Sequence, residues 1–280
     1  YGTRLLPSHR RAVQAILSCR TPELGGQLYR CGCGREHYAY HSCGHRACPR
    51  CGHADATNWI ARQKTRLLPN IPYFLVTFTV PQELRPLFGS QQKLMYSLLF
   101  GQSAATLQDV ADQPKHLGAE LGMLGVLHTW TRQLVYHPHL HYVVAGAGLS
   151  ADGLRWLRVK SSAFFLPEKV LARRFRQRFK QALQQKHPAL AAQVPAAAWR
   201  KDWVVDCVAV GSGESALKYL SAYVYRTALG SQRMARRMTG AYTLVKNREI
   251  GFFDSGLSRR PRMKIVISTG TRVIESSDAN

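Results

Sequence analysis

Acidic residues are scarce in this chain of 280 residues. Its 16 Asp and Glu residues face 39 Lys and Arg residues, which gives a formal net charge of +23 at pH 7. So many positive charges repel one another unless a polyanion neutralises them. Nucleic acid is the polyanion that basic domains most often bind. The composition therefore predicts a nucleic-acid-binding protein.

The sequence also lacks long apolar runs. No stretch approaches 18 consecutive apolar residues, and no charged and then apolar leader opens the sequence. We therefore expect neither a membrane-spanning helix nor a signal peptide. The seven cysteines are odd in number and closely spaced, which argues against a secreted disulfide scaffold.

Apolar residues make up 45% of the chain, which is enough for a packed interior. Short apolar and β-branched runs predict strands over 72–80, 121–130, 133–146 and 203–210. Apolar residues at helical spacing predict helices over 91–112, 168–186 and 214–229. This order predicts an α+β fold: a small N-terminal module, then an antiparallel sheet flanked by helices.

Six of the seven cysteines lie between positions 19 and 51. Cys48 and Cys51 have the spacing of a zinc knuckle, in which one turn presents two sulfurs to a tetrahedral ion. Cys31 and Cys33 form a second pair. Cys19 and Cys43 remain as thiols that could belong to another site. Histidines could complete the coordination, at positions 9, 37, 41, 45 and 53. The sequence predicts Zn²⁺ here and leaves open whether one ion or two are bound.

Two histidines alternate with apolar residues in the segment HPHLHYV, residues 137–143. Because side chains in a strand alternate between two faces, His139 and His141 lie on one face, about 6–7 Å apart along the backbone. Two imidazoles in this arrangement can chelate a divalent ion. The pattern predicts a second metal site.

A metal site needs further ligands. His128, in the segment LHTW, is our first candidate for the third ligand because its strand should lie beside the strand of the histidine pair; Gln133 is the alternative. His137 precedes Pro138, which places it at the beginning or edge of the strand. We therefore assign His137 no role.

Two tyrosines lie one turn apart on the predicted helix ALKYLSAYVYRTAL, residues 216–229. At about 100° per residue, one arc of this helix is apolar, with Leu217, Leu220, Val224 and Ala228. Tyr219, Tyr223 and Arg226 lie together on the opposite side. A phenol has a pKa near 10 and needs activation to act as a nucleophile, which a cation bound to a phosphate can provide. The pair could therefore attack phosphodiesters; an exposed partner-binding face is the alternative.

The helix over 168–186 is strongly basic. It carries Arg173, Arg174, Arg176 and Arg178. We expect it to contact the DNA backbone, with a solvated surface helix as the alternative.

Four motifs occur in a fixed order: a cysteine cluster ending CGHRACPRC, then LHTW, HPHLH and YLSAY before a basic stretch. In this order they resemble the two-tyrosine HUH transposases of the insertion-sequence-91 type. The resemblance runs from about Arg10 to about Lys246. It implies a zinc-binding DNA-recognition module over 1–70, an HUH endonuclease domain over 71–255 and a basic tail over 256–280. It further implies rolling-circle-like transposition through single-stranded DNA at transposon ends, in a bacterial cytoplasm at the nucleoid.

The resemblance also assigns roles to residues. His139 and His141 match the ligands of Mg²⁺ or Mn²⁺, and Tyr219 and Tyr223 match nucleophiles that form 5′-phosphotyrosine intermediates. Arg226 could stabilise charge on the phosphate. The pair Cys31-Gly32-Cys33 is one residue tighter than the expected spacing. The tail beyond Lys246 is shorter than the family's C-terminal region, which predicts a truncated or shortened member.

Two other functions fit parts of the same pattern. A non-catalytic, zinc-dependent DNA-binding regulator would use the histidines and tyrosines structurally. A metal-dependent nuclease would activate water instead of tyrosine.

Overall fold

The computed structural model describes residues 7–45, 47–131 and 135–225, together with the short strand segments 234–236, 242–244, 268–269 and 272–273. The described chain falls into two compact units, which part after Arg62 and again after Leu220. Within the described residues, no helix is both long and apolar enough to cross a membrane.

The first unit contains a helix, a hairpin and the start of a second helix. α1 (Pro7–Ser18) is followed by a 3-10 turn η2 (Pro22–Leu24), strands β1 (Gly26–Arg30) and β2 (Glu36–Tyr40), and α2 (Pro49–Lys64). The hairpin was not predicted, because the cysteines at its turn obscured the strand pattern on either side. Short strands also pair further along the chain, β8 (Met234–Arg236) with β9 (Tyr242–Leu244).

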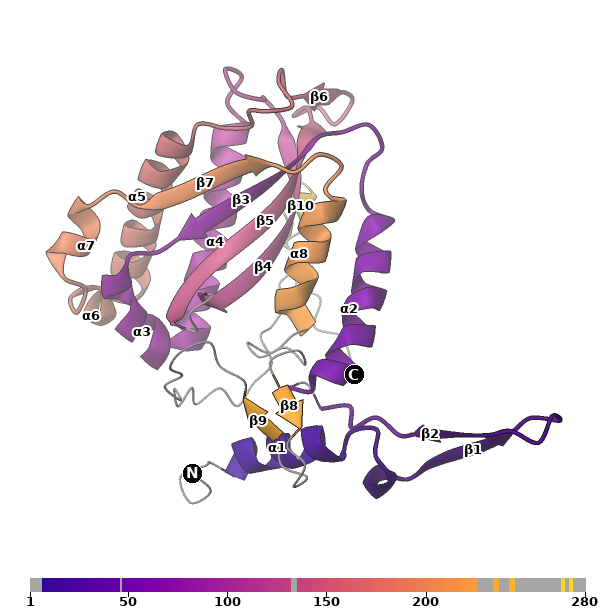
Figure 1. Cartoon of the computed structure of the whole chain (residues 1–280). Coiled ribbons are helices and arrows are strands. Elements are labelled where there is room, and N and C mark those ends of the chain that lie inside the picture. Colours follow the sequence, from indigo (N-terminus) through magenta and orange to yellow (C-terminus); the bar gives the residue numbers. More distant parts are fainter. Residues whose placement is uncertain are drawn as a thin grey trace. The chain divides into compact units, whose positions relative to one another are not determined.

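The hairpin is a two-stranded ribbon that extends away from α1 (Figure 1). Arg30 lies opposite Glu36 in the register, and their side chains form an ion pair at 2.8 Å. Gly34 has φ +84°, a conformation that glycine adopts without strain, and its N–H donates to the carbonyl of Cys31 at 2.9 Å. Nearly every side chain of the ribbon is exposed, including Tyr29 and Tyr38.

The second unit is built on an antiparallel sheet, as the sequence predicts. Its strands are β3 (Tyr73–Thr79), β4 (Glu120–Trp130), β5 (Tyr136–Leu149), β6 (Trp156–Arg158) and β7 (Val204–Ala209). The order is β4-β5-β3-β7, and β6 pairs with the end of β5. β3 and β7 lie within the ranges predicted for them, whereas β4 begins one residue earlier than predicted and β5 ends three residues later. The antiparallel sheet flanked by helices confirms the α+β fold.

One face of the sheet carries the hydrophobic core. Helices cover it: α3 (Arg85–Ser90), α4 (Gln92–Ala111), α5 (Glu168–Lys186), α6 (Pro188–Ala191) and α7 (Ala196–Arg200), with the turn η3 (Gln82–Leu84). Figure 1 shows α4 and α5 on the same side of the sheet. Alternate residues of β3, among them Phe78, point into this core. The ring of Phe78 meets that of Phe175 on α5 at 4.9 Å.

The opposite face carries the polar residues of the sheet and helix α8 (Glu214–Tyr225). Gly213 precedes α8 with φ +83°, and a Cβ there would lie 2.9 Å from the ring of Tyr73. Glycine therefore lets the turn approach β3. Leu217 and Leu220 of α8 are buried, as the predicted apolar arc requires.

The last strand pair is β10 (Ser268–Thr269) with β11 (Arg272–Val273).

Candidate functional site

The sheet register brings three histidines together. His128 on β4 lies directly opposite His139 on β5, and His141 follows two residues later on the same face. One ligand atom from each ring lies within 4.8 Å of the others, and all three side chains are buried. Of the two candidates for the third ligand, His128 joins the pair, whereas Gln133 lies outside the described residues. We call these three residues the imidazole group.

Hydrogen bonds fix which nitrogen of each ring faces the centre of the imidazole group. The Nδ1–H of His139 donates to the carbonyl of His137 at 2.7 Å, which leaves the lone pair on Nε2. That Nε2 lies 3.0 Å from Nδ1 of His128. His141 uses Nδ1 toward the hydroxyl of Thr77 at 2.9 Å, so Nε2 is the ring nitrogen that could bind a metal ion.

Burial keeps these rings neutral. Burial first, and a charge on His139 second, lower the pKa of His128 and of His141 to about 3. Burial likewise lowers the pKa of His137 to about 4. A neutral imidazole is the form that binds metal ions, so the imidazole group is ready to bind a cation at pH 7.

The spacing of the rings also fits a metal ion. Two ligands at right angles, each about 2.1 Å from an octahedral ion, lie about 3.0 Å apart. The nitrogens of His128 and His139 have this separation. With three protein ligands, an octahedral ion keeps positions for water and substrate.

Tyr219 lies beside the imidazole group. Its ring centroid is 5.7 Å from that of His141, with the planes nearly perpendicular at 85°. The side chain is 41% exposed, so the phenol borders the histidines and is open to solvent. Tyr223 lies on the same helix, but its side chain is outside the described residues, as is Arg226.

Four thiols form a second donor group, in the first unit. Cys19, Cys43, Cys48 and Cys51 converge with their sulfurs within 4.8 Å of one another. The sulfur of Cys51 lies 3.6 Å from that of Cys19 and 3.7 Å from that of Cys43. These distances are far too long for disulfides. They match the spacing of about 3.8 Å between sulfurs at 2.3 Å from a tetrahedral zinc ion. We call these residues the thiol group.

A bound cation would be needed to convert the thiol group to thiolates. Burial raises the pKa of Cys43 to about 12, so this thiol stays protonated at pH 7 without a positive charge beside it. Zinc supplies that charge, because thiolates are its preferred ligands.

The ligand set differs from the predicted grouping. Cys19 and Cys43 join Cys48 and Cys51 in one group, and no histidine among the described residues belongs to it. Cys31 and Cys33 are not brought to it. They are exposed because they lie in the turn between β1 and β2, at the tip of the hairpin.

The basic helix α5 does not line the imidazole group. Its Phe175 packs on Phe78, in the core on the other face of the sheet. Ion pairs engage several of its arginines: Arg174 and Arg178 with Asp109, and Arg176 with Asp202. Arg173 is exposed and donates to the carbonyl of Lys169.

Three side chains near the imidazole group were not predicted from the sequence. Thr77 contacts His141, and Arg85 contacts His137 through a hydrogen bond of 2.8 Å. The ring of Trp130 lies 4.6 Å from that of His128. Threonines at two alternate positions of an otherwise apolar strand, Thr77 and Thr79, were the one signal that the face is polar.

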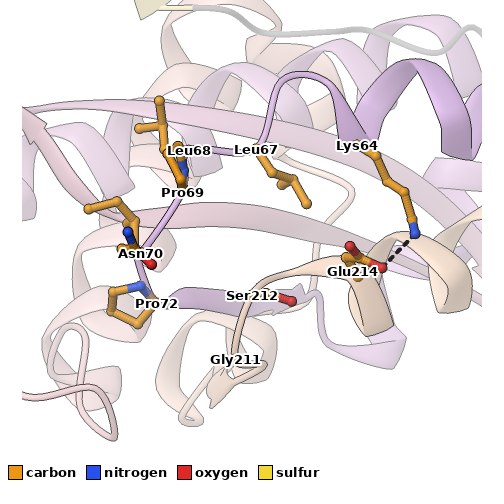
Figure 2. A pocket seen from close by; sticks show the side chains of 10 residues that line it. Lys64, Leu67, Leu68, Pro69, Asn70, Pro72, Gly211, Ser212 and Glu214 are labelled. Atoms are coloured by element: carbon orange, nitrogen blue, oxygen red, sulfur yellow. Dashed lines mark ion pairs between the residues drawn. The ribbon is translucent and has the colours of Figure 1, made fainter.

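A separate recess lies at the other end of β3, beside Pro72 (Figure 2). An ion pair between Lys64 and Glu214 crosses part of its wall. It is lined by Lys64, Leu67, Leu68, Pro69, Asn70, Ile71, Pro72, Gly211, Ser212 and Glu214. Neither donor group contributes to this lining.

Comparison with known proteins decides the family. A family described as a transposase zinc-binding domain matches residues 2–80, which contain the thiol group. A family described as a putative transposase matches residues 122–252, which contain the imidazole group and α8. The chain belongs to the IS91-type transposases. The zinc-binding family and the converging thiols together make Zn²⁺ the metal of the thiol group.

Two curated relatives of this IS91-type chain are similar over most of its length. A putative transposase, y4qJ, of Sinorhizobium fredii is 37% identical over 257 residues, which are 85% of this chain and 64% of that protein. The transposase for insertion sequence element IS801 of Pseudomonas savastanoi pv. phaseolicola is 30% identical over 269 residues, 88% of this chain and 63% of that protein. The chain thus spans a little under two thirds of the length of these relatives. No solved structure matches it significantly.

Proposed function

We propose that this IS91-type chain is a transposase that nicks and rejoins single-stranded DNA by attack of a tyrosine on a phosphodiester. The observation that carries the proposal is the position of Tyr219, whose ring lies 5.7 Å from His141 at the edge of three converging imidazoles. A nucleophile beside a cation site is the arrangement that phosphoryl transfer requires.

The proposed reaction exchanges one phosphoester for another. The hydroxyl oxygen of Tyr219 forms a bond to phosphorus, the bond to the 3′ oxygen breaks, and the phenol's proton is transferred so that a free 3′ hydroxyl leaves. The product is a 5′-phosphotyrosine. Because the ester bond is conserved, a 3′ hydroxyl can later attack it and reseal a strand without ATP. A second tyrosine, Tyr223, would allow two such esters in succession.

The imidazole group would hold a divalent ion through His128, His139 and His141. Such an ion supplies charge stabilisation at the phosphate oxygens and so reduces the need to deprotonate the phenol beforehand. The residues fit Mn²⁺ better than Mg²⁺, since Mg²⁺ prefers oxygen ligands over imidazole. We therefore expect Mn²⁺ to support nicking at lower concentrations than Mg²⁺ does.

DNA binding would use other parts of the chain. We propose that the zinc-binding module recognises the transposon ends and that the arginines of α5 contact the DNA backbone. Each backbone contact should steepen the fall of binding with salt by about 0.7 in the log–log slope on single strands. Removal of Arg173, the exposed member, should make that slope shallower.

The test is a search for a covalent adduct. Zinc-loaded protein is incubated with Mn²⁺ and labelled single-stranded DNA from the element's own ends, and the products are separated under denaturing conditions. We expect labelled protein from the wild type. We expect a loss of at least about 10³-fold in Tyr219→Phe, because the attacking oxygen is gone. Trp156→Phe, at an exposed ring on β6, is the matched control and should behave as the wild type.

The other outcomes identify the alternatives. Cleaved DNA without an adduct would indicate a nuclease that activates water. Bound but uncleaved DNA would indicate a regulator. An adduct that survives in Tyr219→Phe and disappears in Tyr223→Phe would move the first attack to Tyr223.

A further inference from the structure

Two hydrogen bonds made by His137, one through its side chain and one through its backbone carbonyl, link Arg85 to the imidazole group. The guanidinium of Arg85 donates through Nη2 to Nδ1 of His137 at 2.8 Å. The carbonyl of His137 in turn accepts the Nδ1–H of His139 at 2.7 Å. Arg85 can therefore influence the orientation of the His139 ring through His137, without a direct contact to that ring.

The backbone explains why His137 can do this. Between the pairs His128–His139 and Trp130–Tyr136, β4 contributes the single residue Thr129, whereas β5 contributes two. This bulge frees His137 and Pro138 from regular pairing, and bulges commonly redirect side chains next to functional sites. Pro138 has no N–H to satisfy and restricts the backbone of the residue before it. The carbonyl of His137 is thereby held where the ring of His139 can reach it.

Arg85 occupies a position that stability alone does not favour. It begins α3, just past the end of β3. Its Nε is buried and has no hydrogen-bond partner among the described residues. An unsatisfied buried donor costs free energy. A guanidinium that bears this cost and bonds His137 through Nη2 indicates a role at the neighbouring imidazole group.

We propose that Arg85 and His137 are positioning residues for His139, which orient its ring so that Nε2 faces the divalent ion of the proposed site. The proposal rests on the proposed metal role of the imidazole group. It also assigns a function to the first histidine of HPHLH. Partners of this kind fix the tautomer of a ligating histidine, and their loss typically weakens metal binding by about 10–100-fold.

The experiment measures the affinity of the zinc-loaded full chain for Mn²⁺, from the electron paramagnetic resonance signal of the free ion. We expect Arg85→Ala and His137→Ala each to raise the Kd by about 10–100-fold. Because both act on one chain of hydrogen bonds, the double variant should be no weaker than the weaker single variant. Arg155→Ala, at an exposed arginine of the same unit, is the matched control and should leave the Kd unchanged.

A conservative variant separates positioning from mere structural support. The side-chain oxygen of Asn can accept a hydrogen bond where Nδ1 of histidine does. His137→Asn should therefore restore an affinity close to that of the wild type, whereas His137→Ala does not. This comparison remains informative even if Arg85→Ala fails to fold, which circular dichroism would reveal.

The positioning role and the metal site can be tested separately. If His139→Ala abolishes Mn²⁺ binding but Arg85→Ala and His137→Ala leave it unchanged, the positioning role is wrong and the metal site stands. Equal weakening by His137→Asn and His137→Ala would also overturn the positioning role. If His139→Ala itself binds Mn²⁺ as the wild type does, the proposed metal site is wrong.

Discussion

The thiol group and the imidazole group show two ways of gathering metal ligands. The thiol group takes four sulfurs from three short segments within 33 residues of sequence. The imidazole group takes three nitrogens from two strands of a sheet. In the first case we expect the metal to organise the chain, because the hydrophobic core of the described residues lies in the second unit. In the second case the sheet forms without the metal, and the histidine rings project from it.

The number of ligands separates the two groups further. Four sulfurs complete the tetrahedral shell of zinc, as in structural sites, whereas catalytic sites keep positions open. Three imidazoles leave positions open, and an exposed phenol lies beside them. The difference teaches that one group serves folding and the other is suited to chemistry, which the following predictions test.

The largest effect should come from breaking the thiol group. We expect Cys48→Ser to unfold the first unit, since structural zinc supplies about 10–16 kcal/mol of folding free energy in small modules. Limited proteolysis should then cut within residues 7–62 and spare the sheet. Cys33→Ser is the matched control, because Cys33 lies outside the thiol group. Equal protease resistance of the two variants would show that zinc does not hold this unit together.

Breaking the imidazole group should instead remove activity and leave the fold. In His139→Ala, loss of the ion should lower the nicking rate by at least about 10³-fold, since a metal ion supplies several kcal/mol of transition-state stabilisation. Zinc content and protease resistance should not change. The adduct assay and zinc analysis check this, with His187→Ala as a control at a histidine outside the group. Loss of zinc from His139→Ala would mean that the two groups depend on each other.

A smaller effect is expected at the hydroxyl that contacts His141. Thr77→Val keeps the shape of the side chain and removes the hydrogen bond at 2.9 Å. The ring of His141 is then free to change its tautomer, and Mn²⁺ affinity should fall by about 10-fold. Thr79→Val is the matched control on the same strand. The same affinity in both variants would show that the hydroxyl does not orient the ring.

The smallest effect is a pH dependence of stability without Mn²⁺. Burial lowers the pKa of His141 to about 3 in the folded state, whereas an unfolded histidine has a pKa near 6.5. Below that value the unfolded chain binds a proton that the folded chain does not. The contribution of this one ring to stability is therefore complete above about pH 6.5 and falls by roughly 1 kcal/mol per pH unit as the pH drops toward 3.

Urea unfolding of the second unit at several pH values checks this slope. The slope of stability against pH should be smaller for His141→Asn than for the wild type, by the contribution of one histidine. Identical slopes would contradict a buried, neutral ring.

The elements of the second unit were predictable because each has a strong local signal. β3 is an apolar, β-branched run, and α5 carries apolar residues at helical spacing. The hairpin β1–β2 was not predictable, since its strands bury almost nothing and its cysteines suggested metal ligands. Exposed strands lack the alternation by which a half-buried strand is recognised.

The candidate site was predictable in part for the same reason. His139 and His141 share a face by strand alternation alone, and His128 followed from the expected pairing of neighbouring strands. Arg85 and Thr77 could not be inferred, because their contacts depend on the register of β3 against β5 and on the bulge before His139. A one-residue change of register would move every side chain of a strand to the other face.

The exposed hairpin turn has a practical consequence for labelling. The side chain of Cys31 lowers the pKa of Cys33 by hydrogen bonding, which favours the reactive thiolate, and both sulfurs are open to solvent. The sulfurs of the thiol group are engaged by zinc, and burial raises the pKa of Cys207 to about 12. A maleimide dye should therefore attach at the tip of the ribbon, and its fluorescence would test whether DNA approaches the first unit.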